Sequence, residues 1–241
     1  LKMIDVSGIN ALQAAANKID VEMIPAKDIK GGDERNPNMK LAADPKTGII
    51  PGHELKGRPR DLLSKPILAI EYDDGELHVG TGRHRRELYE RYGMEIPVRR
   101  LREKDGWVTK RADGTYDTTK VRLLDALDNI QDGKGSIEDY VAFFRDVKIP
   151  RSEAENEGFL SSKEARTAYA LANDAIDDVR SAANFEGGRR VGYVSPEQAG
   201  AIADAAPKGA WEHNETVQRQ LLKDVLKDRT MDATDITVDA G

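Results

Sequence analysis

The segment Leu77–Arg102 constrains the fold more than any other part of this chain. Alternating apolar residues at its start predict a strand, Gly80-Thr81-Gly82 predicts a turn, and Arg83–Arg86 predicts the start of a helix. Ile96-Pro97-Val98 then predicts the next strand. Glycine lets the backbone approach an anion, and free N–H groups, the helix dipole and arginine forks all attract phosphate. The alternative interpretation is an ordinary strand-to-helix turn with a solvated basic face.

Charge is distributed unevenly along the chain. The formal net charge is −6, which argues against a protein that coats nucleic acid through its overall charge. Seven arginines nevertheless lie within Arg83–Arg102, at positions 83, 85, 86, 91, 99, 100 and 102, against three glutamates. A second basic stretch is Lys56–Arg60. We therefore expect any polyanionic partner to meet a local patch.

Composition excludes several classes of chemistry. The 241 residues contain no cysteine, which excludes thiol catalysis and thiolate metal sites and is typical of a cytoplasmic protein. The four histidines are not paired at helical spacing, so a histidine metal site is not expected. No apolar run approaches the roughly 20 residues that span a bilayer, so no membrane partner is predicted.

The front of the chain mixes helix and strand signals. Besides the strands that border the glycine turn, it contains a loop-rich stretch with four prolines at 30–60, which is typical of a mobile or ligand-ordered segment. Asp73–Glu76 predicts a hairpin turn, and Asp113-Gly114 predicts another. The remaining elements expected here are a helix at 9–18, strands at 21–25 and 67–72, and a helix end at Leu62-Leu63.

Strand signals nearly vanish after residue 117. Helices are predicted at 119–130, 136–147, 161–182, 195–206 and 214–228. Ser136 with Asp139, Ser161 with Glu164 and Ser195 with Gln198 have the spacing of helix caps. The predicted fold class is α+β, with a small mixed sheet in a domain at 1–117 and an all-helical domain at 118–241.

Two sequence boxes resemble the ParB family, within the ParB/sulfiredoxin superfamily. Gly82-Arg83-His84-Arg85 occupies the place of the family's glycine-acid-arginine-arginine box, with Arg83 where the acid usually stands. Leu127–Asp132 resembles the family's ENIQR-type box, with Asp132 in place of the closing arginine. The resemblance covers roughly residues 21–228 and is thin across 30–60 and 103–117. It implies a ParB/sulfiredoxin-like fold; sulfiredoxin chemistry itself needs a cysteine, which is absent.

In that family the two boxes converge on a nucleotide, typically CTP with magnesium. The resemblance therefore implies a phosphate-binding set, whose members are Thr81, Gly82, Arg83, His84, Arg85 and Asn129. It also implies that Asp128 and Asn129 hold magnesium, a hard cation that prefers oxygen ligands. The alternative for these two residues is ordinary polarity of a helix surface. Whether the nucleotide is hydrolysed, as in a weak CTPase, stays open.

The stretch Arg151–Leu171 can form a helix-turn-helix, in which Ser161 caps the second helix. The candidate contacts to double-stranded DNA are Ser162, Lys163, Arg166 and Tyr169. Three glutamates in the first helix oppose this interpretation. The alternative is a helical bundle packed through an alanine stripe at 165, 168, 172 and 175.

The function predicted from the sequence is that of a ParB-like DNA-binding protein of plasmid, phage or mobile-element type, whose first domain binds a nucleotide. The resemblance implies a homodimer, for which the apolar face of the last helix is a candidate. One alternative is a nuclease or small-molecule phosphotransferase on the same fold, an option that His84 keeps open. Another is an inactive interaction module.

Overall fold

The computed structural model describes residues 9–59, 65–183, 185–186, 189–190 and 194–238, with the side chains of 9–10, 185–190 and 228–238 left aside. The helix end expected at Leu62-Leu63 lies outside the described residues. The chain forms two compact units, Leu1–Asp132 and Gly133–Gly241. The boundary expected from the sequence lies between 117 and 118. We call them the first unit and the second unit and describe each by itself.

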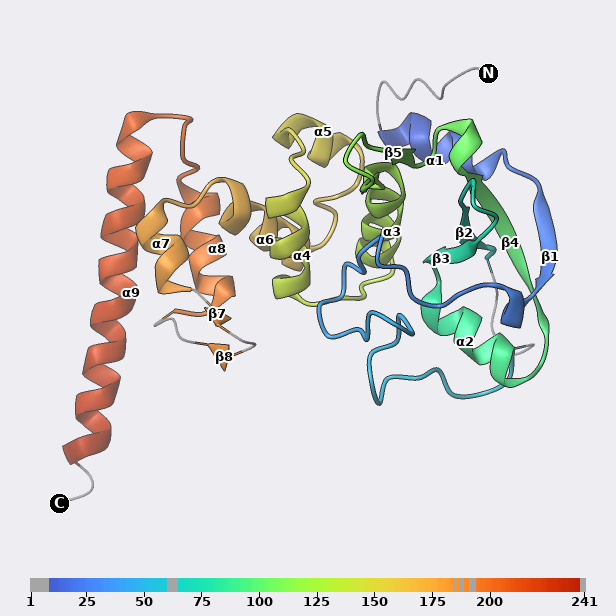
Figure 1. The fold of residues 1–241 in the computed structure, drawn as a ribbon. Coiled ribbons are helices and arrows are strands. Elements are labelled where there is room, and N and C mark those ends of the chain that lie inside the picture. Colours follow the sequence, from blue (N-terminus) through green and yellow to red (C-terminus); the bar gives the residue numbers. More distant parts are fainter. Residues whose placement is uncertain (1–8, 60–64, 184, 187–188, 191–193, 239–241) are drawn as a thin grey trace. The chain divides into compact units, whose positions relative to one another are not determined.

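The first unit is built on a four-stranded sheet of order β1-β4-β2-β3 (Figure 1). Strand β2 pairs in parallel with β4, and the other two pairs are antiparallel. The elements in chain order are α1 (Ile9–Asn17), β1 (Val21–Pro25), η1 (Ala26–Asp28), β2 (Ile67–Glu71), β3 (Leu77–Thr81), α2 (Arg83–Arg91), β4 (Glu95–Arg102), η3 (Glu103–Asp105), β5 (Thr109–Lys110), β6 (Tyr116–Asp117) and α3 (Thr119–Gln131).

Both faces of this sheet are buried. On one face the core contains Ile70 and Leu101 from the sheet, Leu12 from α1 and Val121 from α3. The opposite core contains sheet residues such as Ile67 and Val98, together with Tyr89 of α2. Helix α3 belongs to the first unit because its apolar residues complete the first of these cores. A change from strands to helices along the sequence therefore does not mark the boundary between the units.

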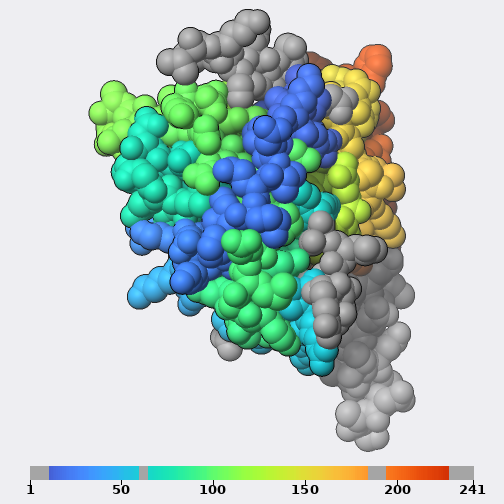
Figure 2. All heavy atoms as spheres, turned by 90° about the vertical axis from the view of Figure 1, so that its right-hand side faces the viewer, coloured from blue at the N-terminus to red at the C-terminus, as the bar shows by residue number. Residues whose placement is uncertain are grey.

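Strand β1 lies at the edge of the sheet. Figure 2 shows it in blue on the surface, and its Val21 and Met23 side chains are 46% and 56% exposed. The expected hairpin between β2 and β3 is confirmed, with Gly75 in the left-handed region at φ 87°. The second expected hairpin is also confirmed as β5 and β6. Trp107 and Val108, which directly precede β5, pack into the core.

The second unit consists mainly of helices. Its elements are α4 (Ile137–Asp146), α5 (Arg151–Asn156), α6 (Lys163–Asn173), α7 (Asp177–Ala182), β7 (Phe185–Glu186), β8 (Arg189–Arg190), α8 (Pro196–Ala205) and α9 (Glu212–Val238). Capping boxes at Ser136/Asp139 and Ser195/Gln198 are confirmed. Ser162 rather than Ser161 caps α6, because its hydroxyl accepts the Ala165 N–H.

The single helix expected at 161–182 is broken between α6 and α7, and Gln218 of α9 holds the break. Its side-chain oxygen accepts the Ile176 N–H at 2.9 Å, and its amide nitrogen donates to the Asp174 and Ala206 carbonyls, each at 2.7 Å. Gln218 is fully buried. Helix ends leave backbone groups without partners, and a buried glutamine that satisfies three of them makes the break stable. Short apolar periodicity alone could not predict this tertiary contact.

Helix α6 lies at the centre of the second unit, packed against α4 and α8. The alanine stripe expected at this interface is buried at all four positions. Gly200 of α8 allows a close approach, because a Cβ there would lie 2.6 Å from the Thr167 carbonyl oxygen. The mixed sheet and the helices together confirm the α+β class. None of the helices in the described part of the chain has the length and apolar character that crossing a bilayer requires.

Candidate functional site

The predicted glycine turn joins β3 to α2. Gly82 precedes the helix at φ 85°, where a side chain would be strained, and a Cβ there would lie 2.5 Å from Ile67 Cγ2. No side chain caps this helix start. Thr81 is buried, and its hydroxyl accepts the Leu68 N–H at 3.3 Å where the register of β2 and β3 shifts. Thr81 therefore shapes the turn, and its hydroxyl oxygen is already bonded within the sheet.

Arg83 points from the start of α2 toward α3. Its guanidinium lies 3.3 Å from the Asp125 carboxylate, and both side chains are more than nine-tenths buried. Burial raises the pKa of Asp125, and the charge of Arg83 acts against that rise. Asn129 donates its amide to the Asp125 carbonyl at 2.8 Å and to its carboxylate at 3.3 Å. Asp125 thus connects Arg83 of the first box with Asn129 of the second.

Each of the seven arginines of the predicted basic patch has a partner within the first unit. Arg86 donates to the Ile29 carbonyl at 2.5 Å, and Arg100 bridges Glu22 of β1 and Glu71 of β2. The remaining partners are Asp125 for Arg83, the Lys65 carbonyl for Arg85, Glu87 for Arg91, the Asn17 and Ile19 carbonyls for Arg99, and Glu71 for Arg102. These arginines hold the sheet and α2 in place, so the patch is not the open cationic surface expected from sequence.

Arg85 and the end of α3 meet at Lys65. Arg85 donates to the Lys65 carbonyl, while the Lys65 ammonium lies 2.5 Å from Asp128 and 3.5 Å from Asp132. Burial lowers the pKa of Lys65, but the two carboxylates outweigh it and leave the pKa raised. Burial lowers the pKa of Arg85, again against the pull of the same carboxylates. Lys65 thus links Arg85 of the first box to Asp128 and Asp132 of the second.

The predicted magnesium ligands do not fit a protein-held ion. Asp128 already carries the Lys65 ammonium, and the Asn129 amide nitrogen donates to Asp125. No group of three or more acidic or histidine side chains in the described residues is arranged to hold a metal. A divalent cation at Asp128 would have to displace a bound ammonium, so no step is assigned to magnesium here.

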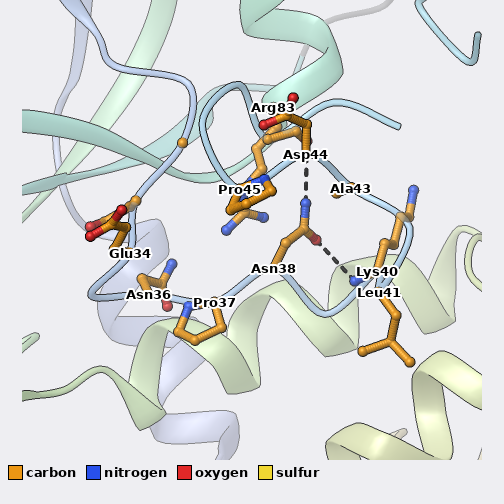
Figure 3. Close-up of a pocket in the computed structure, with 13 residues that line it drawn as sticks. Glu34, Asn36, Pro37, Asn38, Lys40, Leu41, Ala43, Asp44, Pro45 and Arg83 are labelled. Atoms are coloured by element: carbon orange, nitrogen blue, oxygen red, sulfur yellow. Dashed lines mark hydrogen bonds between the residues drawn. The ribbon is translucent and has the colours of Figure 1, made fainter. Parts of the chain in front are cut away.

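A pocket of about 450 Å³ lies beside the start of α2 (Figure 3). The loop at 32–48 forms most of its wall, and Arg83 contributes from α2. Asn38 closes the loop on itself, since its amide donates to the Gly48 carbonyl at 3.2 Å and its oxygen accepts the Lys40 N–H at 3.0 Å. Gly48, at φ 73°, lies so close to Arg83 that a Cβ would meet its Cδ at 2.7 Å. His84 accepts the Ile50 N–H at 3.3 Å.

The start of this loop is anchored by Arg35. Its guanidinium stacks 3.4 Å above the Tyr72 ring and bonds Glu76 at 2.8 Å and Asp74 at 2.9 Å. Tyr72 donates its hydroxyl to buried Asp33 at 2.5 Å, and burial together with this bond raises the pKa of Tyr72. The prolines of this stretch predict a mobile or ligand-ordered segment. No local sequence pattern predicts that Arg35 pairs with a hairpin about 40 residues away.

The predicted DNA-binding residues differ in accessibility. Lys163 and Arg166 are exposed on the first turns of α6. Ser162 uses its hydroxyl to cap that helix. Tyr169 is buried, with its ring edge against Phe144 and its hydroxyl donating to the Ile149 carbonyl at 2.6 Å, so it stabilises the core and does not face a ligand. Sequence could not separate Tyr169 from its exposed neighbours, because burial of that helix face depends on α4 and α8.

Comparisons with known proteins supply no argument about this chain. No model of a protein family matches the sequence, and no curated protein matches it. Among solved structures, the chain is similar to the C-terminally truncated chromosome-partitioning protein ParB from Caulobacter crescentus complexed with CTP-gamma-S. The identity is 15%, the match covers 84% of this chain and 99% of that chain, and the TM-score is 0.28. A likeness this distant carries no functional argument, so function is inferred from the site itself.

Proposed function

We propose that the first unit binds a nucleoside triphosphate, with CTP as the first candidate, and that the second unit binds double-stranded DNA in the manner of a ParB-like protein of plasmid, phage or mobile-element type. The observation that carries the nucleotide proposal is the pocket lined by Arg83 at the glycine turn. Its volume of about 450 Å³ lies in the range of small-ligand sites. The uncapped start of α2 supplies N–H groups and a positive dipole end beside it.

The lining favours a nucleotide over a bare phosphate chain. Lys40 and Arg83 supply positive charge, and Asn36 and Asn38 supply amides. The acidic lining residues are Asp33, Glu34 and Asp44. A ligand whose surface is all phosphate would meet repulsion from these three carboxylates. A base and a ribose offer polar, uncharged groups for the amides and the acidic part of the wall, which leaves the phosphates for the arginine.

Calorimetric titration with CTP, ATP and GTP tests this proposal. We expect saturable binding of at least one nucleotide to the unmodified chain. Ala43→Trp should abolish that binding, because Ala43 lines the pocket and an indole would fill much of it. Ala42→Trp is the matched control, since Ala42 is the exposed neighbour that does not line the pocket. If the two variants bind the nucleotide with equal affinity, the nucleotide does not bind in this pocket.

The DNA proposal rests on α5 and α6, joined by a turn with Gly158 at φ 85°. This arrangement exposes the first turns of α6, which in a helix-turn-helix enter the major groove. Lys163 and Arg166 are the exposed cations there. The acidic residue Glu164 follows Lys163 directly and limits the charge available for phosphate contacts.

Replacing Lys163 and Arg166 together by alanine should weaken binding to a mixed-sequence duplex and flatten its salt dependence. Each lost phosphate contact reduces the slope of log affinity against log salt by about 0.9. The measurement is fluorescence anisotropy over a range of salt concentrations, with the exposed Lys223→Ala on α9 as control. If the double variant keeps the parental slope, then α6 does not contact the DNA.

A second candidate is an interaction module that binds no nucleotide. The observation in its favour is that Lys65 occupies the junction of the two sequence boxes. In that case neither CTP nor the other nucleotides would bind, and the first unit would act through its surface.

A further inference from the structure

We propose that Asn36 recognises the base of the bound nucleotide, by pairing its side-chain amide with an edge on which an exocyclic amino group stands beside a ring nitrogen. Cytosine, adenine and guanine have such an edge, and uracil has none. The inference deepens the proposed function and rests on it. It starts from the position of Asn36, which lines the pocket and is only 2% exposed.

The side-chain oxygen of Asn36 is buried, and no group in the described part of the chain donates a hydrogen bond to it. Buried polar groups in folded proteins are nearly always paired, because leaving water without a replacement hydrogen bond is unfavourable. When an unpaired group belongs to the wall of a pocket, a bound ligand is the natural source of the missing partner. The Asn36 oxygen needs a donor, so the ligand must bring an N–H or O–H group.

Asn38 provides a direct comparison, because it lines the same pocket two residues further along the loop. Its amide donates to the Gly48 carbonyl at 3.2 Å, and its oxygen accepts the Lys40 N–H at 3.0 Å (Figure 3). Both ends of the Asn38 side chain are therefore used to hold the loop. One asparagine thus shapes the pocket, and the other keeps an acceptor for a ligand.

The loop that carries Asn36 is closed at its neck by glycines. A Cβ on Gly32 would lie 2.2 Å from the Pro45 carbonyl oxygen. A Cβ on Gly48 would lie 2.5 Å from the Gly31 carbonyl oxygen. The two ends of the loop therefore touch through backbone atoms, which fixes the backbone of the pocket wall. The amide of Asn36 can still rotate about its last side-chain bond, because that torsion has broad minima, and can turn its oxygen toward the pocket.

Arg83 lines the same pocket and determines which part of the ligand Asn36 receives (Figure 3). Its guanidinium donates to Asp125 at 3.3 Å and has further N–H groups for the phosphates. An ionised phosphate offers only acceptors, so it cannot satisfy the Asn36 oxygen. An amino group of the base can donate to that oxygen, while the adjacent ring nitrogen accepts from the amide nitrogen. The phosphates therefore belong at Arg83 and the base at Asn36.

Affinities for nucleotides and for matched analogues without the exocyclic amino group test the proposal. The analogues of CTP, ATP and GTP carry pyrimidin-2-one, purine and hypoxanthine as their bases. For the nucleotide that the parent chain binds, we expect the analogue to bind at least about tenfold more weakly, because Asn36 would stay unpaired. Asn36→Leu should bind the nucleotide and its analogue within about threefold of each other, and both more weakly than the parent binds the nucleotide.

Asn17→Leu is the control, because Asn17 is exposed and does not line the pocket, and it should keep the parental discrimination. Equal binding of nucleotide and analogue by the parent would overturn the proposal. The same holds if Asn36→Leu discriminates as well as the parent, or if the parent binds UTP more tightly than the other three nucleotides.

Denaturant unfolding of the free chain is a second test, which needs no nucleotide. Asn36→Leu keeps the branched shape of the side chain and removes the unpaired oxygen, so its unfolding midpoint should lie at or above that of the parent. Asn38→Leu should lower the midpoint, because the Gly48 carbonyl and the Lys40 N–H lose their partner. A midpoint of Asn36→Leu below that of the parent would show that the Asn36 amide is structural and would contradict the proposal. If the parent binds no nucleotide, the proposed function fails on the titration, and this comparison still decides the role of Asn36.

Discussion

Replacing Gln218 by leucine is expected to lower the free energy of unfolding of the second unit by about 3–5 kcal/mol. The variant keeps the volume of the side chain but leaves the Ile176 N–H and the Ala206 carbonyl buried without their partner. An unsatisfied buried backbone group costs about 1–3 kcal/mol. The Asp174 carbonyl loses less, because it also accepts the Lys208 N–H at 2.9 Å.

Hydrogen exchange of the full chain measures this effect directly. The Ile176 amide should exchange faster in Gln218→Leu, and the helical signal of the second unit should melt at lower denaturant concentration. Gln220→Leu is the matched control, because Gln220 lies on the same helix, is exposed and bonds only Asp224 in the described structure. Equal protection of Ile176 in both variants would mean that Gln218 does not hold the break between α6 and α7.

Replacing Arg83 by methionine should destabilise the first unit by about 3–5 kcal/mol, since it leaves Asp125 as a buried carboxylate without its cation. Burial already raises the pKa of Asp125 above its ordinary value, and removing Arg83 must raise it further. A carboxyl with a higher pKa in the folded than in the unfolded chain binds its proton more tightly when folded. Its stabilising effect is therefore present at low pH and is lost as the pH rises through the folded pKa.

Denaturant unfolding of Arg83→Met at several pH values checks both statements. The free energies of unfolding of variant and parent should differ least near pH 5 and most near pH 8, because the stabilising effect of a carboxyl with a raised folded pKa is lost as the pH rises. Adding Asp125→Leu should recover most of the lost stability, because apolar residues often replace a buried ion pair at little cost. Arg91→Met, which breaks an exposed pair with Glu87, should cost far less stability than Arg83→Met. A pH-independent loss in Arg83→Met would show that Asp125 is not its essential partner.

Local signals predicted much of the first unit. The hairpin turn at Gly75, the glycine turn at Gly82 and the strand at 96–98 lie where the sequence places them, because glycine at positive φ and apolar alternation are local requirements. The capping boxes at Ser136 and Ser195 belong to the same class. Each depends on residues no more than a few positions apart.

The features that the sequence did not predict depend on residues far apart in the chain. Whether the arginines of α2 and β4 are open or paired depends on carbonyls and carboxylates of α1, β1, β2 and α3, far away in sequence. Lys65 reaches Asp128 across 63 residues, and Arg35 reaches Glu76 across 41. Local charge density predicts a basic surface, but only the tertiary fold decides which charges remain available to a ligand. One contact of the site could have been predicted from the sequence. Asp125 and Asn129 stand four residues apart on one face of α3, the spacing that brings side chains together.

Gln218 also has a mechanical consequence. Its three bonds tie α9 to the end of α6, to the start of α7 and to the end of α8. A displacement of α9 is therefore transmitted to the end of α6, because the side-chain amide of Gln218 connects the two helices. A protein that binds α9 and shifts it would thus also shift the helix that carries Lys163 and Arg166.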